Sequence, residues 1–340
     1  MDTFAKLAAA ERRAYLEETA NRRNSTNTAI EKDFWVCWTL RHLFSLQGVP
    51  QMCFKGGTSL SKVFRLIHRF SEDIDVSLDR AALGFTGKRD LANEDLSNTK
   101  RKQLDKQLRE AIENEVTTKI LPRLSESFAS VIGKTGWSIQ ASAEAGEEMP
   151  LLFSYPNAFD YTAYLRPQIK IEFGRGDQWP SKLFPVVPYV AEEFADIFTL
   201  PNVAVTVLDC QRTFWEKVTL IHAENHRPEP QGLKRRMSRH WSDIAVMSAD
   251  DTFVTEKLDL KLLAEVVKFK KIYFASAWAN YDSAFPATMK LVPNEALHRL
   301  LREDYKAMRE MFVDEPLSFD ELIERLRVLE TRINTMAQVS

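Results

Sequence analysis

Residues 52–78, MCFKGGTSLSKVFRLIHRFSEDIDVSL, constrain the fold of this chain more than any other stretch. A short apolar run ends at Gly56 and Gly57, and because glycine has no Cβ, the backbone there can approach a bound group closely. Thr58 and Ser59 follow, and we expect them to cap a helix over residues 60–67, LSKVFRLI, where free N–H groups can bind an anion. The stretch therefore predicts a strand, a glycine turn, a short helix, a loop and a second strand.

Acidic and apolar residues alternate along the second of these strands. Asp73, Asp75 and Ser77 fall on one face, whereas Ile74 and Val76 fall on the other. Carboxylates this close on one face repel each other unless a cation lies between them, and Mg²⁺ prefers such oxygen ligands. A Gly-Gly pair or an Asp-x-Asp pair alone is usually a turn or a solvated surface. Their order along the chain is what indicates a functional site.

Composition indicates a globular protein that does not enter a membrane. The chain has 340 residues, of which 44% are hydrophobic and 28% are charged, enough for one large domain or two ordinary domains. No apolar run approaches the length of a membrane span, and the start lacks a signal-peptide core. The three cysteines form no Cys-x-x-Cys pair, so we expect a cytoplasmic protein with no membrane partner. The net charge of −2 argues against a protein that coats nucleic acid, but it leaves room for a local basic groove.

A further candidate carboxylate lies on a later predicted strand, residues 164–173. Gln168, Lys170 and Glu172 share one face of this strand, opposite apolar residues. Lys170 is either the ion-pair partner of Glu172 or a phosphate contact, and the sequence leaves both interpretations open.

After Asp209 the apolar spacing becomes helical almost to the end, so we predict two domains, 1–209 and 210–340. In the second domain, Lys217 lies at the edge of the apolar stripe of QRTFWEKVTLIHAEN, where a lysine is most often a snorkelling surface residue. The next segment, KRRMSRHWSDIAVM, carries Asp243. Four basic side chains precede this aspartate, namely Arg235, Arg236, Arg239 and His240.

In this order the motifs resemble the nucleotidyltransferase superfamily of the polymerase-beta type, whose pattern is apolar-Gly-Gly, a gap, then acid-apolar-acid-apolar. KGGTSLSK followed by RFSEDIDVSL is similar to the AbiEii/AbiGii branch, the nucleotidyltransferase toxins of bacterial abortive-infection and toxin–antitoxin systems. TFWEK, LIHAE and RHWSD resemble that family's lysine-bearing and aspartate-bearing motifs. The family also often carries Glu31-Lys32-Asp33, which is either a supporting element beside the site or a mixed-charge helix start.

This resemblance implies an α+β fold, with a polymerase-beta-like nucleotidyltransferase core on a mixed sheet and a C-terminal helical lobe that contributes Lys217 and Asp243 to the cleft. It implies that Mg²⁺ is held by three carboxylates, those of Asp73, Asp75 and Glu172. The nucleotide phosphates are expected to bind the glycine turn and one lysine, namely Gly56, Gly57, Thr58, Ser59 and Lys217. Asp243 is either a general base or a residue that orients Lys217, and the sequence does not separate these roles.

The activity implied by the resemblance is a Mg²⁺-dependent transfer of a nucleotide from an NTP to RNA by a toxin. We expect the four basic side chains ahead of Asp243 to bind RNA phosphates. The family suggests tRNA as the acceptor and an antitoxin encoded nearby as the neutralising partner. Two other interpretations stay open. The chain could be a nucleotidyltransferase that modifies a small molecule or a protein, or a GTP-binding regulatory protein without transfer activity.

Overall fold

The computed structural model describes seven stretches of the chain, namely 1–71, 73–142, 149–161, 166–228, 233–253, 257–312 and 315–336. Contacts divide the chain into two compact units, one of Met1–Val63 and Ser71–Leu208 and the other of Phe64–Phe70 and Asp209–Ser340. The chain therefore passes briefly into the second unit between its Gly-Gly and Asp-x-Asp motifs, a passage that the sequence analysis did not separate from the first domain. None of the described helices is both long enough and apolar enough to cross a membrane.

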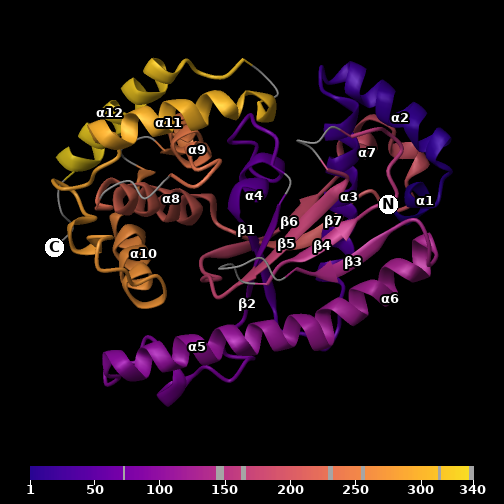
Figure 1. Ribbon diagram of the computed structural model, residues 1–340. Coiled ribbons are helices and arrows are strands. Elements are labelled where there is room, and N and C mark those ends of the chain that lie inside the picture. The colour runs from indigo at the N-terminus through magenta and orange to yellow at the C-terminus, as the bar shows by residue number, and fades with distance from the viewer. Residues whose placement is uncertain are drawn as a thin grey trace. The chain divides into compact units, whose positions relative to one another are not determined.

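A seven-stranded sheet forms the centre of the first unit (Figure 1). Its strands are β1 (Met52–Lys55), β2 (Ile74–Leu78), β3 (Ser138–Ala141), β4 (Leu151–Ser154), β5 (Gln168–Gly174), β6 (Ser181–Val186) and β7 (Val203–Leu208). They lie in the order β3-β4-β5-β2-β1-β7-β6. β2 is parallel to β5 and β1 is parallel to β7, whereas the other neighbours, including β1 and β2, are antiparallel. The predicted mixed sheet and α+β class are confirmed.

The two strands that carry the acidic residues alternate between a buried and a half-buried face, as the sequence predicts. On β2, Ile74 and Val76 are at most 1% exposed, while Asp75 between them is half-buried. On β5, Ile171 is fully buried and the adjacent Glu172 is half-buried. Because successive side chains of a strand point to opposite faces, the apolar face fixes the direction in which the carboxylates point.

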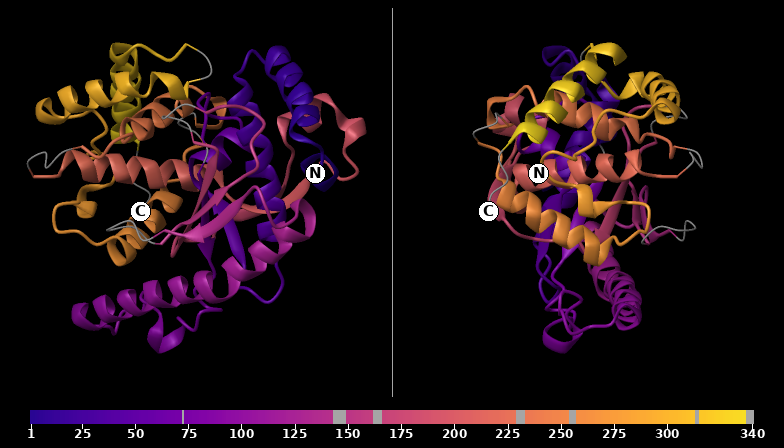
Figure 2. Two further views of the ribbon diagram at one scale, coloured as in Figure 1. Left: turned by 45° about the vertical axis from the view of Figure 1, so that its right-hand side comes forward. Right: turned by 90° about the vertical axis from the view of Figure 1, so that its left-hand side faces the viewer.

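Helices complete the first unit. They are α1 (Asp2–Ala5), α2 (Ala9–Arg22), α3 (Asn27–Phe44), α4 (Gly56–Lys62), α5 (Asn98–Glu115), α6 (Leu121–Ile132) and α7 (Tyr189–Glu193), with 3₁₀ turns at Gly87–Arg89 and Ala195–Ile197. α3 belongs to the core, because its side chains Trp35 and Trp38 are fully buried. A π-helical stretch, Val116–Ile120, joins α5 to α6, and Figure 2 shows the two as one long helix that continues past the sheet.

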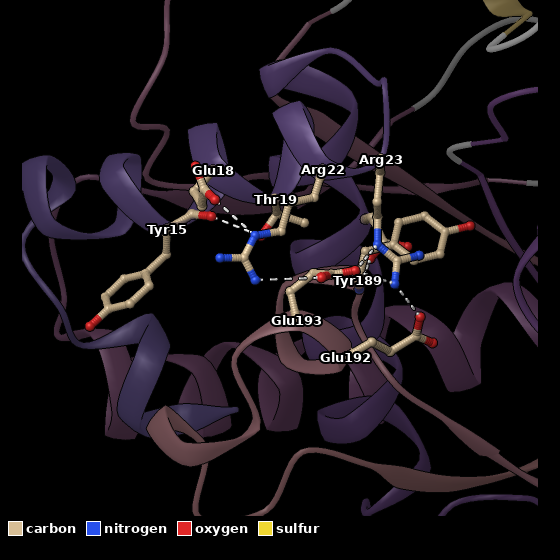
Figure 3. A network of polar contacts seen from close by, with 9 residues as sticks. Tyr15, Glu18, Thr19, Arg22, Arg23, Tyr189, Glu192 and Glu193 are labelled. Carbon is tan, nitrogen blue, oxygen red and sulfur yellow. Dashed lines mark hydrogen bonds and ion pairs between the residues drawn. The ribbon is translucent and has the colours of Figure 1, made fainter.

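Ion pairs join α2 to α7 in the first unit (Figure 3). Arg23 places its Nη2 atom 2.8 Å from Glu192 Oε2 and 2.8 Å from Glu193 Oε1. Arg22 pairs with Glu18 of its own helix, with an Nε–Oε1 distance of 2.8 Å. These side chains are partly exposed, so each pair stabilises the unit by only ~0.2–1 kcal/mol. The pairs serve chiefly to hold α7 in place against α2.

Helices also make up the second unit over its described residues. They are α8 (Cys210–Asn225), α9 (Ser238–Met247), α10 (Leu260–Tyr273), α11 (Glu295–Ala307) and α12 (Phe319–Thr335), with 3₁₀ turns at Asp251–Phe253, Tyr281–Ser283 and Arg309–Met311. Trp215 of α8 and Trp241 of α9 are fully buried in its core. The predicted C-terminal helical lobe is confirmed.

The segment Phe64–Phe70 is bonded into the second unit through its backbone. Arg69 forms an isolated antiparallel bridge with Phe312, and the N–H of Phe70 donates to the carbonyl of Met311 at 2.7 Å. We expected a helix over residues 60–67, but α4 ends at Lys62. The helix is shorter than predicted because its continuation pairs with another part of the chain instead of with itself.

Candidate active site

Three neighbouring strands bring a lysine and two acidic residues into one row across the sheet of the first unit. Lys55 at the end of β1 is opposite Asp75 on β2, and Asp75 is opposite Glu172 on β5. Residues directly opposite each other on paired strands have side chains on the same face. Asp73 lies just ahead of β2. We call Lys55, Asp73, Asp75 and Glu172 the acidic row, because negative charge prevails in it.

The charges of the acidic row perturb one another. Burial, and then repulsion from Glu172 and Asp73, raise the pKa of Asp75 from 3.8 to about 7, and Lys55 opposes this shift only weakly. Lys170 relieves part of the repulsion, since its Nζ lies 2.6 Å from Glu172 Oε1. Of the two roles that the sequence left open for Lys170, the structure shows the ion pair. The row itself thus holds three carboxylates and one lysine.

The donor set of the acidic row fits a divalent cation by its chemistry, because carboxylate oxygens are the ligands that Mg²⁺ prefers. The described residues contain no group of three or more His, Cys, Asp or Glu side chains gathered closely enough to ligate an ion. The raised pKa of Asp75 reflects its burial first and then the repulsion of the neighbouring carboxylates. A cation placed among them would relieve that repulsion.

Gly56 is required by the carboxylate of Asp75. Its φ is +80°, and a Cβ added there would lie 1.9 Å from Asp75 Oδ2 and 2.8 Å from Asp75 Cγ. The sequence analysis expected the glycine to let the backbone approach a bound group. The structure shows that the group nearest to this backbone is the acidic row itself, so Gly56 lets the start of α4 pack directly against a carboxylate.

Thr58 and Ser59 lie inside the first turn of α4 and do not cap it, because the helix begins at Gly56. The Thr58 hydroxyl lies 2.5 Å from the carbonyl oxygen of Asp73 and 2.9 Å from the hydroxyl of Ser71. The Ser59 hydroxyl donates to the carbonyl of Gly56 at 2.9 Å. Both side chains are at most 2% exposed. Their hydroxyls therefore fasten α4 to the chain entering β2, and they are already bonded within the protein.

The other end of α4 is held by the Glu31-Lys32-Asp33 segment of α3. Lys62 Nζ lies 2.6 Å from Asp33 Oδ1, and both side chains are at most 7% exposed. Asp33 Oδ2 also accepts the backbone N–H of Tyr189 at 2.7 Å, and the Lys62 ammonium lies 3.5 Å from the centre of the Tyr189 ring. Of the two interpretations of this segment, its buried ion pair with α4 agrees with the supporting one.

Three charged side chains and a histidine meet inside the second unit. The guanidinium of Arg69 binds both oxygens of Asp243, with Nε–Oδ1 at 2.7 Å and Nη2–Oδ2 at 2.9 Å. Lys217 Nζ lies 3.0 Å from Asp243 Oδ2 and 3.2 Å from His240 Nδ1. Arg69, Lys217 and Asp243 are at most 6% exposed. We call these four residues the buried cluster.

The cations of the buried cluster surround its one carboxylate. Burial alone would raise the pKa of Asp243, but Arg69 and Lys217 outweigh it and hold this pKa well below its usual range. Burial, assisted by Lys217, lowers the pKa of His240, so its neutral ring accepts a hydrogen bond from the Lys217 ammonium. Burial also lowers the pKa of Lys217, against the attraction of Asp243. Asp243 consequently stays ionised near neutral pH and is a poor proton acceptor there.

The four basic residues predicted to bind RNA have different surroundings. Arg235 is exposed, whereas Arg236 and Arg239 are half-buried. The backbone N–H of Arg236, at a φ of 66°, donates to Asp304 Oδ1 at 2.7 Å. His240 is bonded to Lys217 and belongs to the buried cluster.

Lys55 and Arg69 are the residues of these two groups that the sequence analysis missed. Lys55 directly precedes the Gly-Gly motif, and only the pairing of β1 with β2 places it beside Asp75. Arg69 meets Asp243, which is 174 positions further along the chain. No local spacing predicts a contact between residues so far apart in the sequence. The one local signal is the position of Arg69, two residues ahead of the Ser71-Glu72-Asp73 stretch, which marks it as a candidate site residue. Glu72 itself lies outside the described residues.

A glycine turn packed against paired carboxylates on a mixed sheet is typical of nucleotidyl transfer, and comparison with known proteins gives the same class. The chain matches the family described as the nucleotidyl transferase AbiEii toxin of type IV toxin–antitoxin systems over residues 38–325, so it belongs to this family. The predicted family and enzyme class are confirmed. Among solved structures the chain is similar to MenT4, a nucleotidyltransferase toxin from Mycobacterium tuberculosis H37Rv. That match has 18% identity and a TM-score of 0.44, and it covers 96% of this chain and 90% of that chain. A search of curated proteins found no match.

Proposed function

We propose that this nucleotidyltransferase is a toxin that transfers a nucleotide from an NTP to RNA in a Mg²⁺-dependent reaction, with tRNA as the expected acceptor. Its family supplies the class of reaction and implies a cognate antitoxin. The observation that carries the proposal is the acidic row, in which the pKa of Asp75 is raised to about 7 by burial and by neighbouring carboxylates. Such a site favours a cation, and the divalent metal ion that accompanies a triphosphate supplies one.

Asp73, Asp75 and Glu172 are the residues that would hold Mg²⁺. When bound, the ion would neutralise charge on the triphosphate, which is the main requirement of phosphoryl and nucleotidyl transfer. The carboxylates are fixed by the sheet register and by the packing of Gly56 against Asp75. The predicted phosphate contacts of the turn then come from the backbone of Gly56 and Gly57, because the neighbouring hydroxyls are bonded internally.

Lys55 adds a cation to the same face. Its Nζ lies 2.5 Å from the position that a Cβ on Gly176 would occupy, so this glycine makes room for the amine. In the described part of the chain, Lys55 forms no ion pair closer than 4 Å, although its charge lowers the pKa of Asp75. A lysine ammonium without a salt-bridge partner is suited to bind phosphate as a point charge. We assign Lys55 to the triphosphate, beside the metal-binding carboxylates.

We retain Lys217 and Asp243 as site residues, as the family resemblance suggests. Of the two roles left open for Asp243, general base or orienting residue, we choose one. The low pKa of Asp243 and its bonds to Arg69 and Lys217 argue against a general base and support an orienting role. Lys217 is then the residue that acts on the triphosphate. For RNA phosphates we retain Arg235, Arg236 and Arg239, with the exposed Arg235 as the first choice.

The proposal is tested by incubating the protein with each of the four α-labelled NTPs and total bacterial RNA, with either Mg²⁺ or EDTA. We expect label in a discrete RNA band with at least one NTP, only when Mg²⁺ is present, and not with the Asp75→Asn variant. Label that enters protein or a small molecule in place of RNA would contradict the RNA acceptor. Transfer that persists equally in EDTA would contradict the metal.

A further inference from the structure

The segment between the two nucleotide motifs carries a side chain, Arg69, that binds both oxygens of Asp243. Phe64–Phe70 leaves the first unit after α4 and is bonded to residues of the second through Phe70 and Arg69. Four residues after Arg69 the chain reaches Asp73. The stretch of sequence that supplies the metal-binding carboxylates thus also supplies a buried arginine to the unit that contains Lys217.

The contact between Arg69 and Asp243 has the geometry of a fixed support. Two parallel N–H···O bonds, at 2.7 Å and 2.9 Å, determine both the position and the plane of the carboxylate. The second oxygen of that carboxylate also binds Lys217 Nζ at 3.0 Å. His240 Nδ1 accepts a further bond from the same ammonium at 3.2 Å. The Lys217 amine is therefore held by two partners, one of which is itself held by Arg69.

We infer that Arg69 is a positioning residue for nucleotidyl transfer, which acts by fixing Asp243 and, through it, the ammonium of Lys217. The inference rests on the proposed function of Lys217 at the triphosphate. A lysine chain has four rotatable carbons and a compact charge, so it needs external support to stay in one place. Without Arg69, the Asp243 carboxylate is free to turn toward the lysine, and the ammonium moves with it.

A stabilising role alone does not account for this arrangement well. A buried ion pair loses much of its electrostatic gain to desolvation, and apolar side chains of the same volume often stabilise a fold equally well. In the cluster, one carboxylate binds both an arginine and a lysine. Such an arrangement suits a lysine whose ammonium has to be held in one place.

The first experiment is a double-mutant cycle on Arg69 and Lys217, measured as label transferred from α-labelled NTP to total bacterial RNA. Arg69→Ala should lower kcat/KM about 100-fold, because a displacement of ~1 Å in a catalytic group costs about that much. In a Lys217→Ala background the same change should cost less than about threefold, since Arg69 acts through the lysine. Fully additive losses in the two backgrounds would contradict the inference.

The second experiment restores the missing group chemically. A cavity of about 370 Å³ is lined by Arg69 and Asp243, and also by Arg325 of α12. Removal of the Arg69 side chain should leave a space that opens into this cavity. Millimolar guanidinium should then restore at least a tenth of the lost activity of Arg69→Ala, at concentrations far below those that unfold proteins. Methylammonium at the same concentration should not, because it cannot bind both carboxylate oxygens.

Two controls separate positioning from folding. Arg325→Ala removes an arginine from the wall of the same cavity without touching Asp243, and it should leave kcat/KM within about twofold of wild type. Arg69→Lys keeps the charge but loses the second bond, so it should fold like wild type and still lose most of the activity. Wild-type activity in Arg69→Lys would contradict the inference.

A readout without catalysis keeps the inference separate from the proposed function. Protein with ¹⁵N-labelled lysine side chains should show a slowly exchanging ammonium signal from Lys217, identified by its absence in Lys217→Ala. That signal should disappear in Arg69→Ala and return with guanidinium. An unchanged signal in Arg69→Ala would overturn the inference even if the enzyme transfers nucleotides. A wild-type protein that transfers nothing would contradict the proposed function, while the NMR result would still decide the role of Arg69.

Discussion

The acidic row and the buried cluster are built from similar residues and have opposite electrostatics. In the row, half-buried carboxylates lie close together with Lys55 and Lys170 beside them, and the pKa of Asp75 is raised to about 7 by burial and repulsion. In the cluster, a fully buried carboxylate is surrounded by cations, and its pKa is lowered well below the usual range. On this difference we base the proposals that the row binds a ligand and that the cluster supports a side chain.

Removal of a charge from the acidic row should have the largest effect on activity. Asp75→Asn keeps the size of the side chain but removes a metal-binding carboxylate, so transfer should fall by at least about 10³-fold. The fold should be unharmed, because the change relieves repulsion from Glu172. Steady-state transfer and thermal unfolding are measured on the same preparation. A variant that lost stability as well as activity would mean that the row is a structural element like the cluster.

Gly56→Ala tests whether close packing against the carboxylate matters. A Cβ there would lie 1.9 Å from Asp75 Oδ2, so either the carboxylate or α4 has to move. We expect a loss of about 100-fold in kcat/KM together with a destabilisation of ~1–3 kcal/mol, measured by denaturant unfolding.

Gly133→Ala is the matched control for that prediction. Gly133 has a similar φ of +76°, but a Cβ there would meet nothing within 4 Å. It should therefore show the backbone strain of an L-residue at positive φ without any loss of activity. Equal losses of activity in the two variants would show that Gly56 matters through strain alone and not through Asp75.

Lys55→Met tests whether the lysine of the row binds the ligand. If its ammonium binds the triphosphate, the KM for NTP should rise about tenfold, and Lys55→Arg should recover part of the loss. Lys170→Met is the comparison, because Lys170 is already paired with Glu172 at 2.6 Å. A larger effect for Lys170 than for Lys55 would reverse the assignment of the two lysines.

The sequence predicts one of the two regions much better than the other. The alternation of Asp73, Ile74, Asp75 and Val76 reports a strand with an acidic face, because a strand repeats every two residues and burial selects the apolar positions. The same logic finds Glu172. These residues are close in space because their strands are neighbours in one sheet. The sequence pattern of the family is what predicts that the two strands are adjacent.

The sequence predicts neither the contacts of the buried cluster nor the residue at which helix α4 ends. Lys217 looks like a snorkelling residue at the edge of a stripe, yet it is 6% exposed, because Asp243 and His240 give it partners inside the unit. Arg69 reaches Asp243 only because the chain leaves α4 early and pairs with residue 312. Local propensity favours a continued helix there, and a tertiary contact overrides it.

The smallest effects, and those of opposite sign, are expected in the pH dependence of stability. Asp75 has a raised pKa, so the folded protein holds its proton more tightly than the unfolded chain does. In metal-free buffer its contribution should therefore destabilise the protein progressively as the pH rises from about 4 to about 7, and then level off. Asp243 has a lowered pKa, so its stabilising contribution is present above pH 4 and is lost as the pH falls further.

Unfolding in denaturant, followed from pH 3 to pH 8 with EDTA, measures both contributions to the free energy of unfolding. Asp75→Asn should flatten the upper part of the profile and leave the lower part unchanged, whereas Asp243→Asn should do the reverse. Added Mg²⁺ should raise stability near pH 7 in wild type but not in Asp75→Asn. Buried His222 and His240 have lowered pKa values and add a rise in stability over the same range, so the difference between wild type and Asp75→Asn is the deciding quantity. If this difference did not change between pH 4 and pH 7 without metal, the pKa of Asp75 would not be raised, and the distinction between the two regions would then fail.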